Sequence, residues 1–342
     1  MKIHMHSMVF APSVGGVETV GQMLAEEWTR MGVEVRVTTE TPGTDEGLTF
    51  PIIRRPARRA LWELTRWADL VFHNHPSTRV AWAPILCRKP WFATVHTWLP
   101  MYQPSGNLRK RARAAMQRQL VSKCRFIAVS RAIARHLPDR VAPVLPNPCR
   151  FPYLARGGEQ KRPVDLLFVG RLVSDKGADL LIEALARLAQ EKHYFKTKII
   201  GDGPLRSNLQ SKLESCHLDG LVDFTGTLSG EAVRGAYCSA RYTVVPSRWE
   251  EPFGLVAIEA LACGSVPIVA DSGGLPEAVG PHGIVFPCGD ADALAGVLRR
   301  ISEKGDEAAD AGTDRSTVAK WLERHDPEVV ARRYLDLFRE AV

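Results

Sequence analysis

The chain has 342 residues, which is long for one domain and suits two. With 45% hydrophobic and 24% charged residues, its composition is that of a globular protein. No run approaches the roughly 20 apolar residues of a membrane helix, so a membrane-spanning protein is not expected. The run Lys2–Met8 resembles a short strand and lacks the apolar segment of a secretory signal, so we expect no signal peptide.

Seven cysteines without a CxxC pair predict neither a disulfide framework nor a zinc site, and they fit a reducing cytoplasm. The net charge of +7 is unevenly divided. Residues 1–150 hold 22 Lys and Arg against 10 Asp and Glu, a balance of +12, and the remainder has a balance of −5. We therefore expect the first half to face an anionic partner: nucleic acid, a membrane surface or an acidic substrate.

Short β-like runs alternate with helical patterns through the first half, which predicts a parallel sheet covered by helices. The expected strands are Lys2–Met8, Val33–Thr38, Leu70–His73, Trp91–Val95, Arg125–Val129 and Ala142–Leu145. Amphipathic helices are expected at Val17–Met31 and Leu108–Val121. A polar stretch rich in Gly and Pro, residues 146–163, then predicts a linker.

A second alternating series follows the linker. Its expected strands are Val164–Val169, Lys198–Ile200, Val222–Phe224, Tyr242–Val245 and Val266–Ala270. Its expected helices are Ala178–Leu188, Leu205–Glu214, Glu231–Ser239, Leu255–Ala262, Ser316–Glu323 and Pro327–Glu340. The sequence thus predicts an α/β protein with two Rossmann-like, doubly wound domains that face each other across a cleft, with ligands beyond the carboxyl ends of the strands.

The segment Val244–Val279 carries the strongest site pattern, because a strand, a loop with Glu251 and a helix with Glu259 follow one another. The helix start at Gly254–Val256 offers free N–H groups and a positive dipole end, which suit a diphosphate. Glu259, about one turn further on, can accept both hydrogen bonds of a ribose diol. Glu251 would lie on the other side of the diphosphate, where an attached sugar would be. Two isolated glutamates would be interpreted as solvent-exposed acids, but their position around a strand–loop–helix junction favours a ligand-binding site.

The segment Phe168–Gly177 places Arg171 after a strand and Lys176 at the start of the next helix. Two cations on one loop can close on two phosphates. They would stabilise a leaving nucleoside diphosphate where a metal otherwise would. A purely structural role is disfavoured because cations are unfavourable beside a helix N-terminus.

Weaker glycine and histidine patterns complete the set. Gly15 and Gly16 make either a tight turn or a close approach to a ligand. The Gly201 motif lacks the third glycine of a dinucleotide fingerprint, which argues against NAD or FAD. Paired histidines at 4 and 6 and at 73 and 75 are interpreted as core or cleft residues because no third metal ligand has a telling spacing. Asp290 is interpreted as a helix N-cap, so no metal site is predicted.

Together these motifs resemble the GT-B glycosyltransferases of family 4, a large retaining family. The first-half matches are GGVE at 15–18, HNH at 73–75, TVH at 94–96 and VS at 129–130. The second-half matches are VGRLVSDKG at 169–177, IIGDGP at 199–204, FTG at 224–226, EPFGLVAIE at 251–259, GGLPEAV at 273–279 and GIVFPCGDADAL at 283–294. They cover nearly the whole chain in order, and the second half is the more specific.

The resemblance implies an acceptor-binding domain at 1–150 that includes a crossover helix at 326–342, and a nucleotide-sugar-binding domain at 160–325. Its implied catalytic set is His96, Glu251, Arg171 and Lys176. Its implied donor-binding set is Gly15, Gly16, Arg171, Lys176, Gly201, Leu228, Glu251, Phe253, Gly254, Leu255, Val256 and Glu259. One departure is Pro146-Asn147-Pro148, where the family usually has Asn-Gly.

The family's chemistry implies transfer from a nucleoside-diphosphate-sugar, with uridine diphosphate as the default, without a metal or other cofactor and with retention of configuration. A front-face route is implied, in which the leaving phosphate helps to take the acceptor's proton. The expected acceptor is a saccharide or lipid-linked saccharide in surface polysaccharide or glycolipid assembly.

Basic residues at 54–59 and 109–118, beside Trp98 and Tyr102, suit docking at an anionic lipid surface, although a solvated helix face would look the same. Four alternatives remain open: a nucleotide-sugar 2-epimerase, a natural-product glycosyltransferase, a glycan phosphorylase and a nucleic-acid-binding protein. The last explains the basic half but not the diphosphate pattern, so no nucleic-acid partner is expected.

Overall fold

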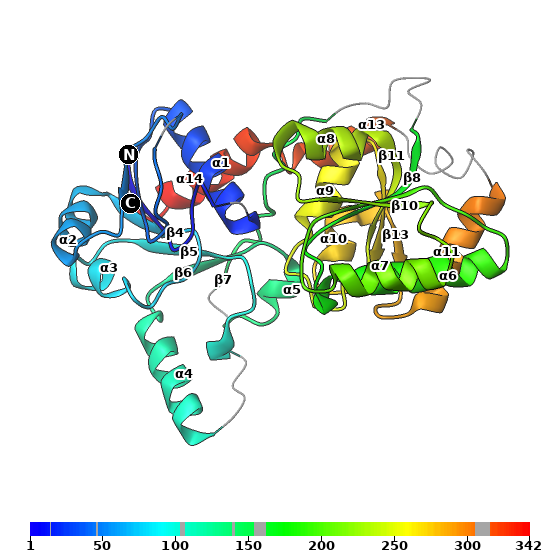
Figure 1. Cartoon of the computed structure of the whole chain (residues 1–342). Helices are drawn as coiled ribbons and strands as arrows, with labels where there is room; N and C mark the ends of the chain where they lie inside the picture. Colours follow the sequence, from blue (N-terminus) through cyan, green and yellow to red (C-terminus); the bar gives the residue numbers. More distant parts are fainter. Residues whose placement is uncertain (14, 46, 103–106, 139–140, 154–161, 305–314) are drawn as a thin grey trace. The chain divides into compact units, whose positions relative to one another are not determined.

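The computed structural model describes residues 1–342 except 14, 46, 103–106, 139–140, 154–161 and 305–314 (Figure 1). It divides into two compact units. The first comprises Met1–Arg150 and Arg324–Val342, and the second Phe151–Glu323. The boundary lies at the start of the predicted linker, whose residues 154–161 are outside the described part.

The first unit contains a seven-stranded parallel sheet in the order β3-β2-β1-β4-β5-β6-β7. Its strands are β1 (Lys2–Ser7), β2 (Glu34–Thr39), β3 (Ile52–Arg54), β4 (Leu70–His73), β5 (Trp91–Val95), β6 (Arg125–Ala128) and β7 (Val141–Ala142). Its helices are α1 (Gly16–Arg30), α2 (Arg58–Trp67), α3 (Trp82–Leu86), η1 (Pro100–Tyr102), α4 (Leu108–Leu120), α5 (Arg131–Ala134) and α14 (Pro327–Arg339).

Several features of this unit differ from the expectation, among them the helices α2, α3 and α5, which were not predicted. The edge strand β3 was not predicted, because three half-buried residues are too few to show a period. The last strand was expected at Ala142–Leu145, but β7 ends at Ala142. Pro143 follows it, and proline has no N–H to donate to a sheet ladder.

The second unit contains a six-stranded parallel sheet in the order β10-β9-β8-β11-β12-β13. Its strands are β8 (Val164–Val169), β9 (Thr197–Ile200), β10 (Val222–Gly226), β11 (Ala240–Val245), β12 (Val266–Ala270) and β13 (Ile284–Phe286). Its helices are η2 (Ser174–Lys176), α6 (Ala178–Gln190), α7 (Arg206–Ser215), α8 (Gly230–Ser239), α9 (Leu255–Ala262), α10 (Leu275–Val279), η3 (Gly280–His282), α11 (Ala291–Lys304) and α13 (Arg315–Glu323).

Both sheets reverse their strand order once. Helices cover the second sheet on both sides: α6 packs with α7 and α11, and α9 packs with α8, α10 and α13 (Figure 1). The reversal lies between β1 and β4 in the first unit and between β8 and β11 in the second. In open α/β sheets, ligands bind beyond the carboxyl ends of the strands at this point. The expectation of two doubly wound α/β domains is confirmed.

The end of the chain completes the core of the first unit. The rings of Phe72 and Tyr334 have centroids 5.7 Å apart, and those of Phe92 and Phe338 are 4.8 Å apart. Trp28 of α1 packs on Phe338, and its Nε1 donates to the backbone carbonyl of Ala331 at 3.0 Å. All five rings are fully buried, so apolar packing holds α14 on the first unit.

A second buried layer consists of histidines. The ring nitrogens of His4 lie 3.2 Å from Thr65 Oγ1 and 2.9 Å from Thr38 Oγ1. Burial and the neighbouring His6 lower the pKa of His4 to about 3. Burial and Arg79 lower the pKa of His6 to about 4. These histidines are neutral core residues, as the sequence suggested.

The aromatic cluster predicts a large stability loss on truncating Phe338. Phe338→Ala is expected to lower the free energy of unfolding by about 3–5 kcal/mol, because it leaves a cavity between four rings. Val342→Ala, at an exposed site on the same terminus, is expected to change it by less than ~0.5 kcal/mol. Denaturant titration compares the two. Equal effects would contradict the packing role of α14.

The histidine layer predicts acid sensitivity. An unfolded histidine binds a proton near pH 6.5, whereas these folded ones bind it only near pH 3 to 4, so the unfolded state takes up more protons between those values. Stability is therefore present above pH 6.5 and falls as pH falls, by about 1.4 kcal/mol per pH unit for each neutral histidine. Denaturant titrations between pH 7 and 5 measure this fall in the free energy of unfolding. His4→Gln should make the free energy of unfolding depend less steeply on pH, and the same change at the exposed His136 should leave that dependence as it is.

Candidate active site

Arg171 stands at the point where the second sheet reverses its order. It follows Gly170, whose amide donates to Ile200 O at 3.0 Å and so extends the edge of β8. The Arg171 side chain is exposed and makes no hydrogen bond or ion pair with any residue that the structure describes. A guanidinium without a carboxylate is a ready partner for a phosphate.

Glycines let the loops around Arg171 touch. Gly177 has φ 72°, and a Cβ there would lie 2.0 Å from Pro246 O. Gly201 has φ 136°, and a Cβ there would lie 1.9 Å from Gly170 O. The loops after β8, β9 and β11 therefore meet backbone to backbone. Gly201 therefore has a packing role in the structure. The predicted contact between Gly201 and the nucleotide-sugar donor stays a prediction.

Lys176 and Glu251 form an ion pair. Lys176 Nζ lies 2.6 Å from Glu251 Oε1, and the side chains are 25% and 13% exposed. Ser247 Oγ donates to the same oxygen at 2.8 Å. The Nζ also lies 5.4 Å from the centre of the Trp249 ring. The sequence assigned these two residues to different parts of the ligand and did not predict that they pair.

The start of α9 presents unpaired amides. Within the described part of the chain, the N–H groups of Gly254, Leu255 and Val256 donate no hydrogen bond. Gly254 has φ 120°, and a Cβ there would lie 2.8 Å from Leu275 Cδ2. The Phe253 side chain is buried in the core. This helix end therefore combines free donors with the positive end of the helix dipole.

Glu259 is buried on the same helix, one turn past these amides. The hydroxyl of Tyr237, from α8, donates to Glu259 Oε2 at 3.0 Å. Leu228, half-buried, lies just before α8. Sequence reasoning missed Tyr237 and Ser247, because helical periodicity marks Tyr237 as a core residue and nothing local marks a serine four residues before a glutamate.

The backbone of Glu251 is fixed by a second pair of glycines. Gly274 N donates to Glu251 O at 2.6 Å, and Gly273 has φ 57° with its Cβ position 2.1 Å from that same oxygen. Any side chain at Gly273 would displace the loop that carries Glu251. Both glycines belong to the GGLPEAV motif, and this motif is the sequence feature that could have indicated their role.

In the first unit, His96 follows β5 directly and is buried. Its Nε2 lies 3.2 Å from Asn74 Oδ1. The amide nitrogen of Asn74 donates to Val17 O at 2.8 Å and to Ser7 Oγ at 3.1 Å, so Oδ1 is the acceptor and His96 Nε2 the donor. Burial, and then the neighbouring His75, lower the pKa of His96 to about 3. At neutral pH it is therefore an uncharged hydrogen-bonding group.

Gly15 and Gly16 lie at the start of α1, where Gly15 is the N-cap residue with extended backbone. Val14, the residue before them, lies outside the described residues. The three atoms nearest to a Cβ at Gly15 all belong to the flexible Glu18 side chain. The predicted site residues thus fall into two groups, one in each unit.

Among the residues that the structure describes, no group of three or more His, Cys, Asp or Glu is arranged to hold a metal ion. Asp290 Oδ1 accepts a hydrogen bond from Ala293 N at 2.8 Å at the start of α11, which confirms its interpretation as a cap.

Comparisons with known proteins agree with this architecture. Residues 153–315 match the model of the glycosyl transferases group 1, and residues 14–149 match that of glycosyltransferase family 4. The chain is 28% identical over 392 residues to the 2-deoxystreptamine N-acetyl-D-glucosaminyltransferase of Streptomyces fradiae, covering 96% of this chain and 90% of that protein.

A shorter match has higher identity. The GDP-mannose-dependent alpha-(1-6)-phosphatidylinositol dimannoside mannosyltransferase of Mycobacterium tuberculosis is 35% identical over 142 residues, 41% of this chain and 36% of that protein. In relatives of 31% to 37% identity, the match spans only 27% to 38% of their length.

A solved structure matches the whole fold. Anabaena HepE, crystallised with UDP-glucose, has a TM-score of 0.75 and 18% identity, covering 99% of this chain and all of that one. The two family models together take in most of both units, and their order follows that of the units. The chain belongs to the group 1, family 4 glycosyltransferases, and its fold is GT-B.

Proposed function

We propose that this chain is a retaining glycosyltransferase that needs no metal. It moves a sugar from a nucleoside-diphosphate-sugar, with uridine diphosphate as the carrier, to a hydroxyl of a saccharide or lipid-linked saccharide. The pathway is surface polysaccharide or glycolipid assembly. One observation carries the donor assignment: an unpaired arginine, a lysine and an unpaired helix start all follow the strands at the reversal point of one sheet.

A diphosphate fits this arrangement electrostatically. Arg171 can grip one phosphate with its planar fork, and the amides of Leu255 and Val256 can donate to another. When the glycosidic bond breaks, the diphosphate gains negative charge. Cations and dipoles already in place stabilise that charge without reorganising. This is the role that a metal plays elsewhere, so none is required here.

The Lys176–Glu251 ion pair is weak enough for Lys176 to exchange Glu251 for a phosphate of the donor. An ion pair partly open to solvent contributes on the order of 1 kcal/mol or less, so a diphosphate can take over the lysine. Glu251 then keeps its hydrogen bond from Ser247 and turns its free oxygen to the sugar hydroxyls. Donor binding therefore releases the carboxylate that orients the sugar.

Glu259 and His96 complete the assignments. Glu259 accepts from the ribose hydroxyls while Tyr237 fixes its other oxygen. His96, uncharged, hydrogen-bonds the donor sugar near the reacting carbon. Neither acts as a nucleophile. The leaving phosphate takes the acceptor's proton on the same face, which gives retention.

The choice of carrier and acceptor rests on relatives. HepE was crystallised with UDP-glucose, and the mycobacterial relative is named for transfer to a phosphatidylinositol dimannoside. A saccharide on an anionic lipid matches the balance of +12 in residues 1–150. We further propose that the first unit meets an anionic membrane surface. No helix in the described part is long and apolar enough to cross a membrane.

A small aminocyclitol is the second candidate acceptor. It is favoured by the match that covers 96% of the chain, to an enzyme named for 2-deoxystreptamine. An acceptor that carries amino groups is cationic at neutral pH, and the basic first half would repel it. A lipid-linked acceptor avoids this repulsion, so it is the one proposed.

Donor binding is tested by thermal shift with UDP, GDP, ADP and their sugars in the presence of EDTA. The matching nucleotide at 100 times its Kd should stabilise the protein by about 2.7 kcal/mol. Arg171→Ala and Glu259→Gln should each weaken binding by roughly ten- to a hundredfold, because each removes a charge-assisted hydrogen bond. Arg300→Ala, an exposed arginine on α11, is the matched control. Full stabilisation in both variants would refute the donor site.

Stereochemistry and metal independence are tested on the product. Proton NMR of the first turnovers should show the donor's anomeric configuration retained, at an undiminished rate in EDTA. Lys176→Ala should lower kcat by about a hundredfold or more, because a fixed charge on the leaving group is lost. Lys304→Ala, exposed on α11, should leave kcat unchanged. An inverted product, or activity restored only by a divalent metal, would contradict the mechanism.

A further inference from the structure

Helix α4 is exposed on almost every side. It begins after Asn107, whose Oδ1 accepts from Lys110 N at 3.1 Å, and it packs on η1. Of its 13 residues only Ala114 is buried. Figure 1 shows it extending away from the sheet of its own unit. An isolated helix of this length is marginal in water, so a surface of this kind gains stability from a partner.

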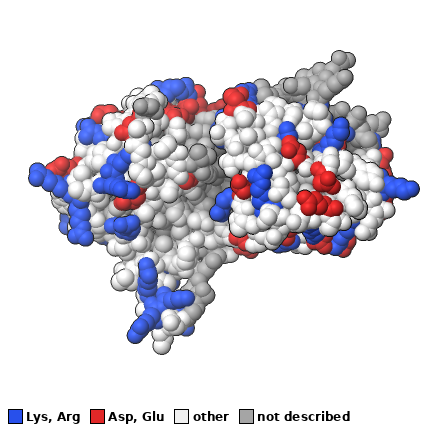
Figure 2. All heavy atoms as spheres, in the orientation of Figure 1, with Lys and Arg blue, Asp and Glu red and all other residues white. Residues whose placement is uncertain are grey.

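Its charges add to that instability. Arg109, Lys110 and Arg111 occupy the first turn, where the helix dipole disfavours cations. The sequence contains no Asp or Glu at any position from 70 to 138. Within the described residues, none of these three side chains forms an ion pair. Figure 2 shows the Lys and Arg side chains over α4 with no acidic side chain among them. A partner that neutralised this surface would therefore be anionic.

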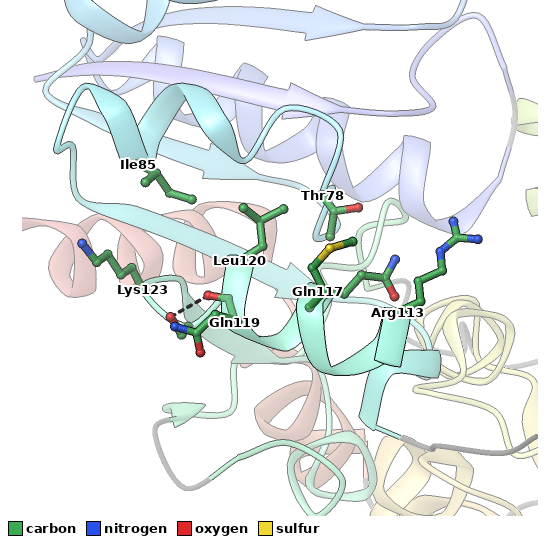
Figure 3. A pocket seen from close by; sticks show the side chains of 9 residues that line it. Thr78, Ile85, Arg113, Gln117, Gln119, Leu120 and Lys123 are labelled. Atoms are coloured by element: carbon green, nitrogen blue, oxygen red, sulfur yellow. Dashed lines mark hydrogen bonds between the residues drawn. The ribbon is translucent and has the colours of Figure 1, made fainter. Parts of the chain in front are cut away.

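A groove of about 670 Å³ runs beside α4. Ile85 of α3 and Met116 and Leu120 of α4 give it apolar walls, and Arg113 and Lys123 also line it. Figure 3 shows Leu120 pointing towards Ile85, with Arg113 and Lys123 at opposite ends. The volume is that of small-molecule sites in general. An elongated apolar ligand with a negative end fits it.

We propose that this groove binds one hydrocarbon chain of an anionic phospholipid, with the lipid phosphate on Arg113. Arg109 and Lys110 lie one helical turn from Arg113 on the same face and add to the charge that meets the phosphate. The proposal extends the membrane contact in the proposed function from a general charge attraction to a defined lipid site. It involves none of the donor-site residues.

Exposed apolar side chains distinguish a lipid from the other polyanions. Leu108 is 82% exposed, Met116 69% and Leu86, next to Ile85, 64%. A nucleic acid or an acidic peptide would satisfy the arginines and leave these side chains in water. A lipid layer buries the apolar groups and neutralises the cations together.

The groove is tested with a lipid that dissolves as a monomer. Dioctanoyl phosphatidylglycerol below its micelle concentration should bind at one site per chain by calorimetry, and glycerol phosphate, which lacks a chain, should not bind measurably. Met116→Glu should weaken binding by roughly tenfold or more, because it places a carboxylate in the apolar wall. Val285→Glu, an exposed site on β13, is the matched control.

Vesicle flotation tests the charge. On vesicles with phosphatidylglycerol, replacing Arg109, Lys110 and Arg111 by Gln should weaken binding about a hundredfold. The same change at Lys196, Lys304 and Lys320, exposed in the second unit, should have little effect. If the protein floated with vesicles but did not bind the monomeric lipid, the proposal that the groove holds a lipid chain would be wrong. Preferential binding of RNA or an acidic peptide would contradict it as well. Because nucleotide binding is measured separately, either failure leaves the donor assignment standing.

Discussion

The candidate site of the second unit gathers positive groups and leaves part of them without a counterpart. Arg171 and the amides at the start of α9 have no acceptor among the described residues, and Lys176 has only a partly exposed glutamate. A diphosphate would complete this charge balance, and the proposed donor site depends on that complementarity. The positions of these groups depend on glycine, since Gly177 and Gly201 allow the loops to meet at distances that no side chain permits.

Each acidic or imidazole group of the site is held by another polar side chain. Tyr237 holds Glu259, Ser247 holds Glu251 and Asn74 holds His96. These supports restrict the rotamers of the groups that would contact the donor, so less conformational entropy is lost when the ligand binds. Tyr237 also comes from a different helix, so the geometry of Glu259 depends on the packing of α8 against α9.

In the first unit, the buried polar groups are uncharged and the charged groups lie on the surface. Its interior holds neutral histidines and the aromatic rings that anchor α14, where burial excludes charge. Its surface carries the excess of arginine and lysine, which is greatest on α4. The uncharged interior and the basic surface of this unit are therefore separate features, and only the surface is open to an anionic partner of the kind proposed.

The sequence by itself determined the alternation of strands and helices, and with it the two doubly wound sheets and the placing of Arg171, Lys176 and Glu259 after strands. These follow from local periodicity and from the motif order. It missed β3, β13, α3, α5 and α10, which have three to five residues, too few to show a period. It also missed α2, although this ten-residue helix is amphipathic. Only the tertiary structure decided that Lys176 pairs with Glu251, that Tyr237 holds Glu259 and that a groove lies beside α4. These pairs are 75 and 22 residues apart, and such contacts arise from the packing of whole elements, which no local pattern records.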